Sequence, residues 1–254
     1  MTIWLIFIIL AYFIGSIPVG VLLARSRGID IREHGSKNVG ATNVGRVLGK
    51  KLGYVCFVLD VAKGALPVIA AGLAAGVFGR SVVEMSALDM WLWLTVGLAA
   101  VLGHMCSIFL RFTGGKGVAT GFGALAAMWP LLTIPTFAAL IVWYATMRIS
   151  RYVSLASVLA ALSLPVTTLL LLMPQAPPEP DEANGPAVDA VVHAVPLLIV
   201  TAALAGLVVF KHRGNLRRIQ RGEEPKVGEP APGDANAESN GESAGSSTPD
   251  STGR

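Results

Sequence analysis

The chain is poor in charge. Of its 254 residues only 14% are Asp, Glu, Lys or Arg, whereas 53% are hydrophobic, and its mean hydropathy is +0.62. Soluble domains carry about a quarter charged residues. The few charges are clustered, which leaves apolar stretches of about 20 residues, each long enough to cross a hydrocarbon core of about 30 Å. This pattern excludes a water-soluble fold and predicts an integral membrane protein.

Cysteine is scarce as well. Cys56 and Cys106 both lie inside apolar segments, which is typical of packing residues and argues against a disulfide or a metal pair. The net charge of +4 would suggest nucleic-acid binding in a soluble protein. Here the basic residues sit at the ends of apolar segments, where they determine membrane topology, so no nucleic-acid partner is expected.

The apolar segments occupy approximately residues 3–23, 52–78, 90–110, 118–147, 152–173 and 188–210. The first has no basic residues before it and no Ala-x-Ala site, so we expect a retained span and not a cleaved signal peptide. The fourth, as one straight helix, would be roughly 45 Å long and would exceed the bilayer core. Because Pro130 and Pro135 lie near its middle and proline breaks helices, we expect a helical hairpin there.

The lysines and arginines predict the topology. They gather in residues 24–51, 111–117 and 148–151 and after residue 210, whereas residues 79–89 hold only Arg80 and residues 174–187 hold none. By the positive-inside rule the basic group is cytoplasmic and the other two loops are external. Both ends of the 118–147 hairpin then face the cytoplasm. The predicted fold is all-α, with seven transmembrane helices, the N-terminus outside and the C-terminus cytoplasmic.

The composition changes near the end of the chain. Residues 225–254 are rich in Gly, Pro, Ser, Ala and Glu, and such a segment cannot bury enough apolar surface to offset its ordering entropy. The sequence therefore predicts a transmembrane domain over 1–224 and a disordered cytoplasmic tail over 225–254.

The first cytoplasmic loop combines small residues with hydrogen-bonding side chains and positive charge between Gly35 and Arg46. Glycines let backbone amides approach a ligand closely, and an arginine can bind phosphate through two hydrogen bonds. Hydroxyls or phosphate oxygens can be bound by Ser36, Asn38, Thr42 and Asn43. An ordinary polar turn between two spans is the alternative.

The second loop contains Gly114-Gly115-Lys116-Gly117 in front of an apolar segment. A glycine-rich turn that opens a helix, with one lysine, is a plausible phosphate cradle. It is not a nucleotide-binding P-loop, because Leu110 stands where the first glycine would be and Gly117 replaces the magnesium-binding Ser or Thr. The alternative is a flexible turn with an orienting lysine.

Two further stretches lie on the same side of the membrane. Ser154 begins a helix, where capping alone would explain it, and the basic run from Lys211 to Glu223 would suit a segment that binds anionic lipid. Within the membrane, Asp60 and Lys63 are three residues apart and could pair, either as a structural ion pair or as functional groups. The convergence of all the polar loops on one face is what a phosphate-binding pocket would need.

These stretches together resemble the acyl-phosphate:glycerol-3-phosphate acyltransferase family of bacterial membranes, over roughly residues 1–225. The resemblance lies in Gly35–Asn43, Asp60–Gly64 and Phe112–Thr120, and in His212, Asn215 and Glu223, which fit a C-terminal His-Arg-x-Asn-Ile-x-Arg-Leu-x-x-Gly-x-Glu pattern. It implies seven spans in the cell inner membrane. It also implies acyl transfer from acyl phosphate to the 1-hydroxyl of glycerol 3-phosphate, which gives lysophosphatidate.

The resemblance also implies the site. The family's functional positions correspond to Ser36, Arg46, Lys116, Ser154, His212 and Asn215. Substrate binding is further assigned to Asn38, Thr42, Asn43, His104, Gly114, Gly115 and Gly117. The partners are acyl phosphate, glycerol 3-phosphate and membrane lipids, and no metal or other cofactor is expected.

The residues fit direct acyl transfer. No histidine belongs to a His-x-x-x-x-Asp pair, since Phe109 holds the acidic position after His104. Acyl phosphate is already activated, so the departing phosphate can take the hydroxyl proton without a protein base. Two alternatives remain open: a transporter of an anionic or phosphorylated solute, with its site near the broken hairpin, and a lipid-binding scaffold that uses the basic start of the tail.

Overall fold

The computed structural model describes residues 1–172 and 186–229. Residues 174–185 of the predicted external loop over 174–187, and most of the predicted tail, lie outside the described residues, whereas residues 186 and 187 are helical. Over the described part the chain is helical, and the one extended contact there is a single bridge between Ser107 and Thr113. The all-α prediction is therefore confirmed for this part.

The helices follow one another along the chain with short connections. They are α1 (Thr2–Ser16), α2 (Val19–Arg25), α3 (Ala41–Val47), α4 (Lys50–Ala74), η1 (Val82–Glu84), α5 (Ala87–Met105), η2 (Ile108–Leu110), α6 (Val118–Ala126), α7 (Thr133–Ser150), α8 (Val153–Leu172) and α9 (Pro186–Gln220). Among the described residues, five segments are long and apolar enough to cross a membrane: Thr2–Arg25, Lys50–Ala74, Ala87–Met105, Val153–Leu171 and Val195–Gln220. The protein is thus a multi-pass membrane protein.

The predicted break in the 118–147 segment is confirmed. Helix α6 ends at Ala126 and α7 begins at Thr133, on either side of Pro130. With nine residues, α6 is only about 13 Å long, too short to span a bilayer alone. It is enclosed by α4, α5 and α7, which all contact it, as expected for a short helix at membrane depth.

The first apolar segment is also broken, which the sequence analysis did not predict. Helix α1 stops at Ser16, and α2 starts after Pro18. The ammonium of Lys63 donates a hydrogen bond to the carbonyl oxygen of Ile17 at 2.9 Å. A carbonyl at the break thus gains a charged partner inside the bundle, which supports the bend.

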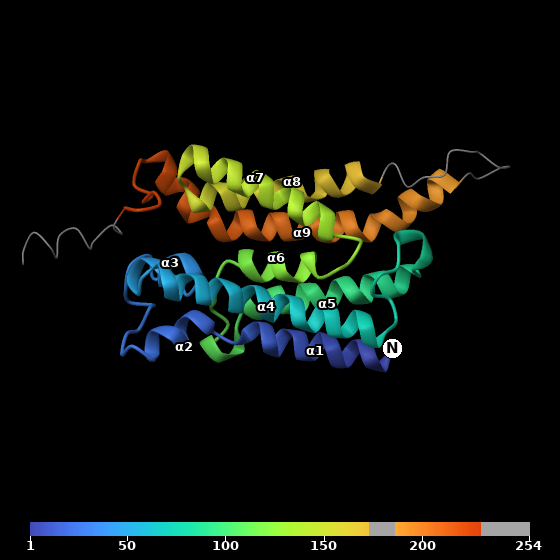
Figure 1. Ribbon diagram of the computed structural model, residues 1–254, viewed down its shortest axis with the longest axis horizontal. Coiled ribbons are helices and arrows are strands. Elements are labelled where there is room, and N and C mark those ends of the chain that lie inside the picture. Colours follow the sequence, from blue (N-terminus) through green and yellow to red (C-terminus); the bar gives the residue numbers. More distant parts are fainter. Residues whose placement is uncertain (173–185, 230–254) are drawn as a thin grey trace, which may run out of the picture.

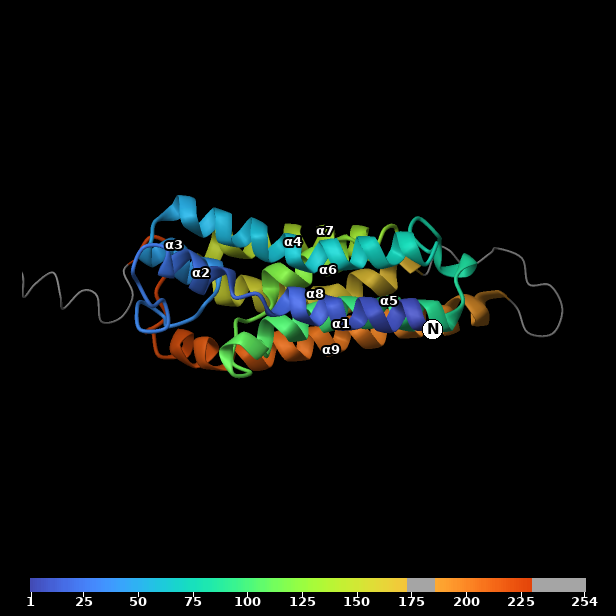
Figure 2. The same ribbon diagram turned by 90° about the horizontal axis from the view of Figure 1, so that it is seen from below.

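The helices run roughly side by side (Figures 1 and 2), and Figure 1 shows α7, α8 and α9 on one side and α1, α4, α5 and α6 on the other. Both views place α2, α3 and the last described residues at the end of the bundle away from the N-terminus. The connection from α5 to α6 also lies toward that end. The polar loops that the sequence singled out are therefore neighbours in space.

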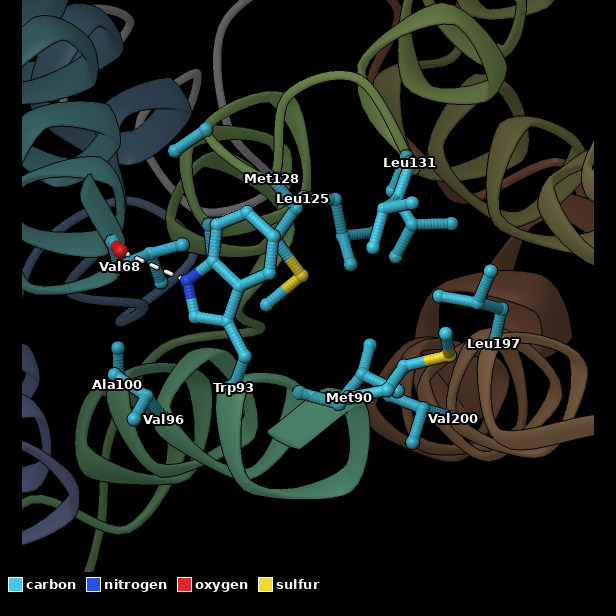
Figure 3. Packing of buried hydrophobic residues seen from close by; sticks show 14 of the residues in the cluster. Val68, Met90, Trp93, Val96, Ala100, Leu125, Met128, Leu131, Leu197 and Val200 are labelled. Carbon is cyan, nitrogen blue, oxygen red and sulfur yellow. Dashed lines mark hydrogen bonds between the residues drawn. The ribbon is translucent and has the colours of Figure 1, made fainter. Parts of the chain in front are cut away.

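The core lies between the two groups of helices. Trp93 of α5 is 1% exposed, and its indole N–H donates to the carbonyl oxygen of Val68 in α4 at 2.9 Å (Figure 3). Leu125 of α6 and Leu197 of α9 belong to the same buried cluster. This packing holds α6 against helices of both groups. It therefore also determines the position of Lys116, which lies just before α6.

Candidate active site

A cavity of about 400 Å³ opens at the end of the bundle where the polar loops meet. It is lined from the first loop and α3, from the segment around Lys116, and from α8, α9 and the residues after α9. All six residues that the resemblance assigned to function line it: Ser36, Arg46, Lys116, Ser154, His212 and Asn215. So do Asn38, Thr42, Asn43, His104 and Gly117.

A hydrogen-bond network connects three of these residues through the carboxylate of Glu224. The ammonium of Lys116 donates to Asn215 Oδ1 at 2.7 Å, and Asn215 Nδ2 donates to Glu224 Oε1 at 2.6 Å. The hydroxyl of Ser154 donates to the same carboxylate oxygen at 2.9 Å. Arg218 Nε donates to the other oxygen at 2.8 Å. Residues from three separate segments are thereby held in fixed positions around one carboxylate.

Glu224, and not Glu223, is the glutamate of the C-terminal pattern. Counted from His212, that pattern places its acidic residue at position 224, so the assignment of Glu223 was one residue off. The chain turns back at Gly222, which has φ +72°. The N–H groups of Gly222 and Glu223 donate to the carbonyls of Ile219 and Arg218 at 3.0 and 2.8 Å, the pattern of a Schellman cap. This turn brings Glu224 into the cavity.

The residues after Glu224 also contribute to the wall. Pro225 and Val227 line the cavity. The N–H of Val227 donates to the carbonyl oxygen of Arg151 at 2.9 Å, and the guanidinium of Arg151 donates to the carbonyl oxygen of Val227 at 2.8 Å. The segment is therefore attached to the connection between α7 and α8.

The first loop is shaped by Asn43, which is 1% exposed. Its Oδ1 accepts the N–H of Ser36 at 2.8 Å. Its Nδ2 lies within 2.9–3.3 Å of the carbonyl oxygens of Ile31, His34 and Asn38. The amide is occupied by the loop itself, so Asn43 supports the loop backbone, while the side chains of Ser36 and Arg46 face the cavity as lining residues.

The glycine-rich segment divides into two parts. Gly114 and Gly115 pack against His104: an added methyl on Gly114 would meet its carbonyl oxygen, and one on Gly115 would meet its Nε2. The N–H of Gly115 donates to the carbonyl oxygen of His104 at 3.1 Å. Gly117 and the first residues of α6 instead line the cavity. The first N–H groups of a helix lack intrahelical partners, and this helix start can receive an anion.

Asp60, Lys63 and His104 form a buried polar cluster beside the cavity. Lys63 Nζ lies 2.7 Å from Asp60 Oδ1, so the predicted pair is formed. His104 Nδ1 lies 3.7 Å from the same oxygen. Asp60 and His104 also line the cavity. A histidine and an aspartate are thus neighbours in space, although the sequence has no His-x-x-x-x-Asp pair, because His104 comes from α5 and Asp60 from α4.

His212 presents one ring nitrogen for ligands. The side chain is 2% exposed, and its Nδ1 lies 2.8 Å from the carbonyl oxygen of Val208. Because a carbonyl only accepts, Nδ1 carries the proton of this bond, and Nε2 of the neutral ring is an acceptor. A hydroxyl in the cavity could donate to it.

The cavity favours anions. Its lining carries four cationic side chains, Lys37, Arg46, Lys116 and Arg218, and two carboxylates, Asp60 and Glu224, of which Asp60 is paired with Lys63. Burial lowers the pKa of Lys116 to about 8; Glu224 opposes this effect, and the charges of Arg218 and Arg46 add to it. A bound dianion would relieve the repulsion among these cations.

A second hollow, almost entirely apolar, continues from the cavity between α6, α7 and α8. Phe57, Gly117, Val118, Trp143 and Ser157 line both hollows. No signal in the sequence marks this groove, because its lining residues resemble those of any apolar membrane helix.

The fold and the cavity define a multi-pass membrane protein with a cationic cavity that opens into an apolar groove. The family model described as glycerol-3-phosphate acyltransferase matches residues 5–222. The glycerol-3-phosphate acyltransferase of Geotalea daltonii is 40% identical over 224 residues, which cover 88% of this chain and 97% of that protein. This chain belongs to the glycerol-3-phosphate acyltransferase family.

Solved structures agree with this assignment. The chain is similar to the crystal structure of PlsY (YgiH), an integral membrane glycerol 3-phosphate acyltransferase, in its glycerol 3-phosphate form, with a TM-score of 0.71, 34% identity, and coverage of 89% of this chain and 96% of that one. For the lysophosphatidic acid form the TM-score is 0.68 at 33% identity, with coverage of 89% and 95%.

Proposed function

We propose that this protein transfers an acyl group from acyl phosphate to the 1-hydroxyl of glycerol 3-phosphate, producing lysophosphatidate and phosphate. The observation that carries the proposal is that a cationic cavity opens directly into an apolar groove, with lining residues in common. The cavity suits two phosphate groups, and the groove suits the hydrocarbon chain of one substrate. The named forms of the PlsY structures, with glycerol 3-phosphate and with lysophosphatidic acid, fit the acceptor and the product.

We infer that each part of the site has a distinct task. Arg46 and Lys116, with the N–H groups at the start of α6, hold the phosphates close together and stabilise the oxyanion. Ser36, Asn215 and the Nε2 of His212 orient the glycerol hydroxyls. Ser154 acts through Glu224, to which its hydroxyl donates.

The reaction needs no covalent protein intermediate. The 1-hydroxyl oxygen of glycerol 3-phosphate attacks the acyl carbon, a new ester bond forms, and the bond from that carbon to the phosphate oxygen breaks. The departing phosphate takes the hydroxyl proton, so atoms and charge balance without a protein base. Two phosphate groups held close together repel each other, and the cationic side chains that line the cavity offset that repulsion.

We further propose seven crossings of the cell inner membrane, with the N-terminus outside and the cavity facing the cytoplasm. The basic loops at the cavity end support this orientation. The hairpin of α6 and α7 would supply the two segments beyond the five long helices, with the short α6 completing its crossing together with the connections at its ends. Cysteines introduced singly at Lys51 and Val83, in a background without Cys56 and Cys106, test it. A membrane-impermeant maleimide applied to intact cells should label only position 83.

We also propose that residues 1–224 form the acyltransferase domain, followed by a cytoplasmic tail. Because Pro225 and Val227 line the cavity, we extend the domain to Glu229. Truncation after Glu229 should retain activity, whereas truncation after Glu224 should reduce it.

The test of the function is a donor comparison with the purified protein in detergent. Palmitoyl phosphate and palmitoyl-CoA are each supplied with and without glycerol 3-phosphate, and lysophosphatidate and phosphate are measured. We expect lysophosphatidate from palmitoyl phosphate only, and only when the acceptor is present. Product from palmitoyl-CoA alone would overturn the donor assignment. No product from either donor would favour a transporter, for which uptake of glycerol 3-phosphate into proteoliposomes is the measurement.

The lowered pKa of Lys116 predicts the alkaline limb of the pH profile. The ammonium is charged below its pKa of about 8 and loses its charge as the pH rises through that value, so binding of the acceptor phosphate should weaken. We expect kcat/KM for glycerol 3-phosphate to fall roughly tenfold per pH unit above about pH 8. Lys116→Arg, which stays charged, should shift the fall to higher pH. An unchanged limb in that variant would show that a group other than Lys116 titrates in this range.

A further inference from the structure

The apolar groove ends inside the protein, which gives it a definite length. Val118 of α6, Trp143 of α7 and Ser157 of α8 lie where it joins the cavity. Further along the same three helices, the lining residues are Leu125, Thr136 and Leu164. These distal residues are 3%, 3% and 9% exposed. All three helices therefore line one hollow, which joins the cavity at one end and stops at buried side chains at the other. It is open at the side, where the lining residue Leu140 of α7 is 36% exposed.

The closed end is part of the packed core. Leu125 and Leu164 belong to the buried cluster that also contains Met128, Leu131 and Leu132, and Figure 3 shows Leu125 beside Met128 and Leu131. Protein cores are close-packed, so this wall cannot yield to a longer ligand without rearrangement. Between α6 and α7, Phe122 and Phe137 pack edge to face with their centroids 5.8 Å apart.

The middle of the groove is made by small side chains. Gly121 of α6, Ala139 of α7 and Ala160 of α8 line it, so the space that larger residues would fill is left for a ligand. At the cavity end Phe57 lines both hollows and is 41% exposed. A lipid-dissolved chain can therefore reach the junction from the side.

We propose that the groove is a ruler for the acyl chain of the donor, whose far end is set by Leu125 and Leu164. This rests on the proposed function, because the phosphate end of the chain must lie in the cavity. From Gly117 to Leu125 the groove runs eight residues of helix, roughly 12 Å. An extended hydrocarbon chain zigzags, so each C–C bond of about 1.5 Å advances it by only about 1.3 Å, and this distance accommodates on the order of ten carbons. Carbons beyond that number leave the groove through its open side at Leu140 and add nothing to recognition, so palmitoyl phosphate remains a donor.

The ruler predicts a break in the dependence on chain length. Each methylene buried from water contributes about fourfold in kcat/KM. The measurement is kcat/KM for saturated acyl phosphates from butyryl to palmitoyl phosphate, at fixed glycerol 3-phosphate and with the donor concentration taken as that of free monomer. This kcat/KM should rise by about fourfold per carbon and then level off near ten carbons. A steady rise to palmitoyl phosphate, or no rise at all, would overturn the ruler.

Two substitutions should move the break in opposite directions. Ala160→Leu fills the middle of the groove, so the break should move several carbons shorter. Leu164→Ala opens the far end, so the break should move one or two carbons longer. The matched control is Ala203→Leu on α9, because Ala203 is exposed and does not line the groove; its break should stay at the wild-type length.

The outcomes separate the ruler from the proposed function. If Ala160→Leu and Leu164→Ala remain monodisperse and change the rate for every chain length by the same factor, the chain does not lie in this groove and the ruler is wrong. If no acyl phosphate of any length yields lysophosphatidate with the wild-type protein, the proposed function fails, and the ruler fails with it. A break that moves as described supports both.

Discussion

Lys116→Ala should reduce kcat/KM for lysophosphatidate formation by about 10²–10³-fold, the usual loss when a positioned donor to a developing negative charge is removed. Lys116 is the one lysine of the glycine-rich segment and donates to Asn215 at 2.7 Å. Its loss removes a buried charge next to the acceptor phosphate and frees one end of the Glu224 network. The measurement is the steady-state rate with palmitoyl phosphate and glycerol 3-phosphate.

The control removes a lysine that lies outside the cavity. Lys51→Ala changes the net charge equally, but Lys51 is exposed at the start of α4 and does not line the cavity, so its rate should stay near the wild-type value. Lys116→Arg keeps the charge and should retain more activity than the alanine variant. Equal rates for Lys116→Ala and the wild type would exclude this lysine from the reaction.

Gly123→Ala should destabilise the protein and abolish most of its activity. A methyl on Gly123 in α6 would collide with the carbonyl oxygen of Val61 in α4, and one on Gly64 would collide with that of Thr120. These two glycines let the helices meet backbone to backbone, a contact common between membrane helices. Overpacking costs about 1–3 kcal/mol, which lowers Tm by roughly 2–12 °C in a domain of this size.

Thermal unfolding in detergent, followed by size-exclusion chromatography, measures this effect. Gly206→Ala on α9 is the matched control, since a methyl there meets nothing within 4 Å; its Tm should be unchanged or slightly higher because alanine favours helix. Activity should fall with Gly123→Ala because α6 begins directly after Lys116. A Gly123→Ala protein with wild-type Tm and activity would contradict the close contact of α4 and α6.

The sequence was informative where one local property decides the outcome. Apolar length predicted the spans, paired prolines predicted the break between α6 and α7, and the clustering of basic loops predicted which loops meet. The Asp60–Lys63 pair followed from helical spacing and is formed at 2.7 Å. In each case the physical cause lies within a few residues of its effect.

Features that depend on packing between distant segments were missed. Glu224 enters the site because Gly222 turns the chain back after α9, and its partners come from α8 and α9. Lys116, in the segment before α6, joins this network through Asn215. Gly115 points its N–H at His104 and not into the cavity, which no spacing rule indicates. The apolar groove exists because small residues of several helices face one another, a register that a single sequence does not reveal.

The most direct test of the account is a rapid-quench experiment that follows phosphate and lysophosphatidate together in the first turnover. Protein mixed with radiolabelled palmitoyl phosphate alone should release no phosphate and carry no label. Addition of glycerol 3-phosphate should release phosphate and lysophosphatidate at the same rate and in equal amounts. A burst of phosphate without the acceptor, with labelled acyl groups bound covalently to the protein, would contradict direct transfer between two substrates held in one cavity.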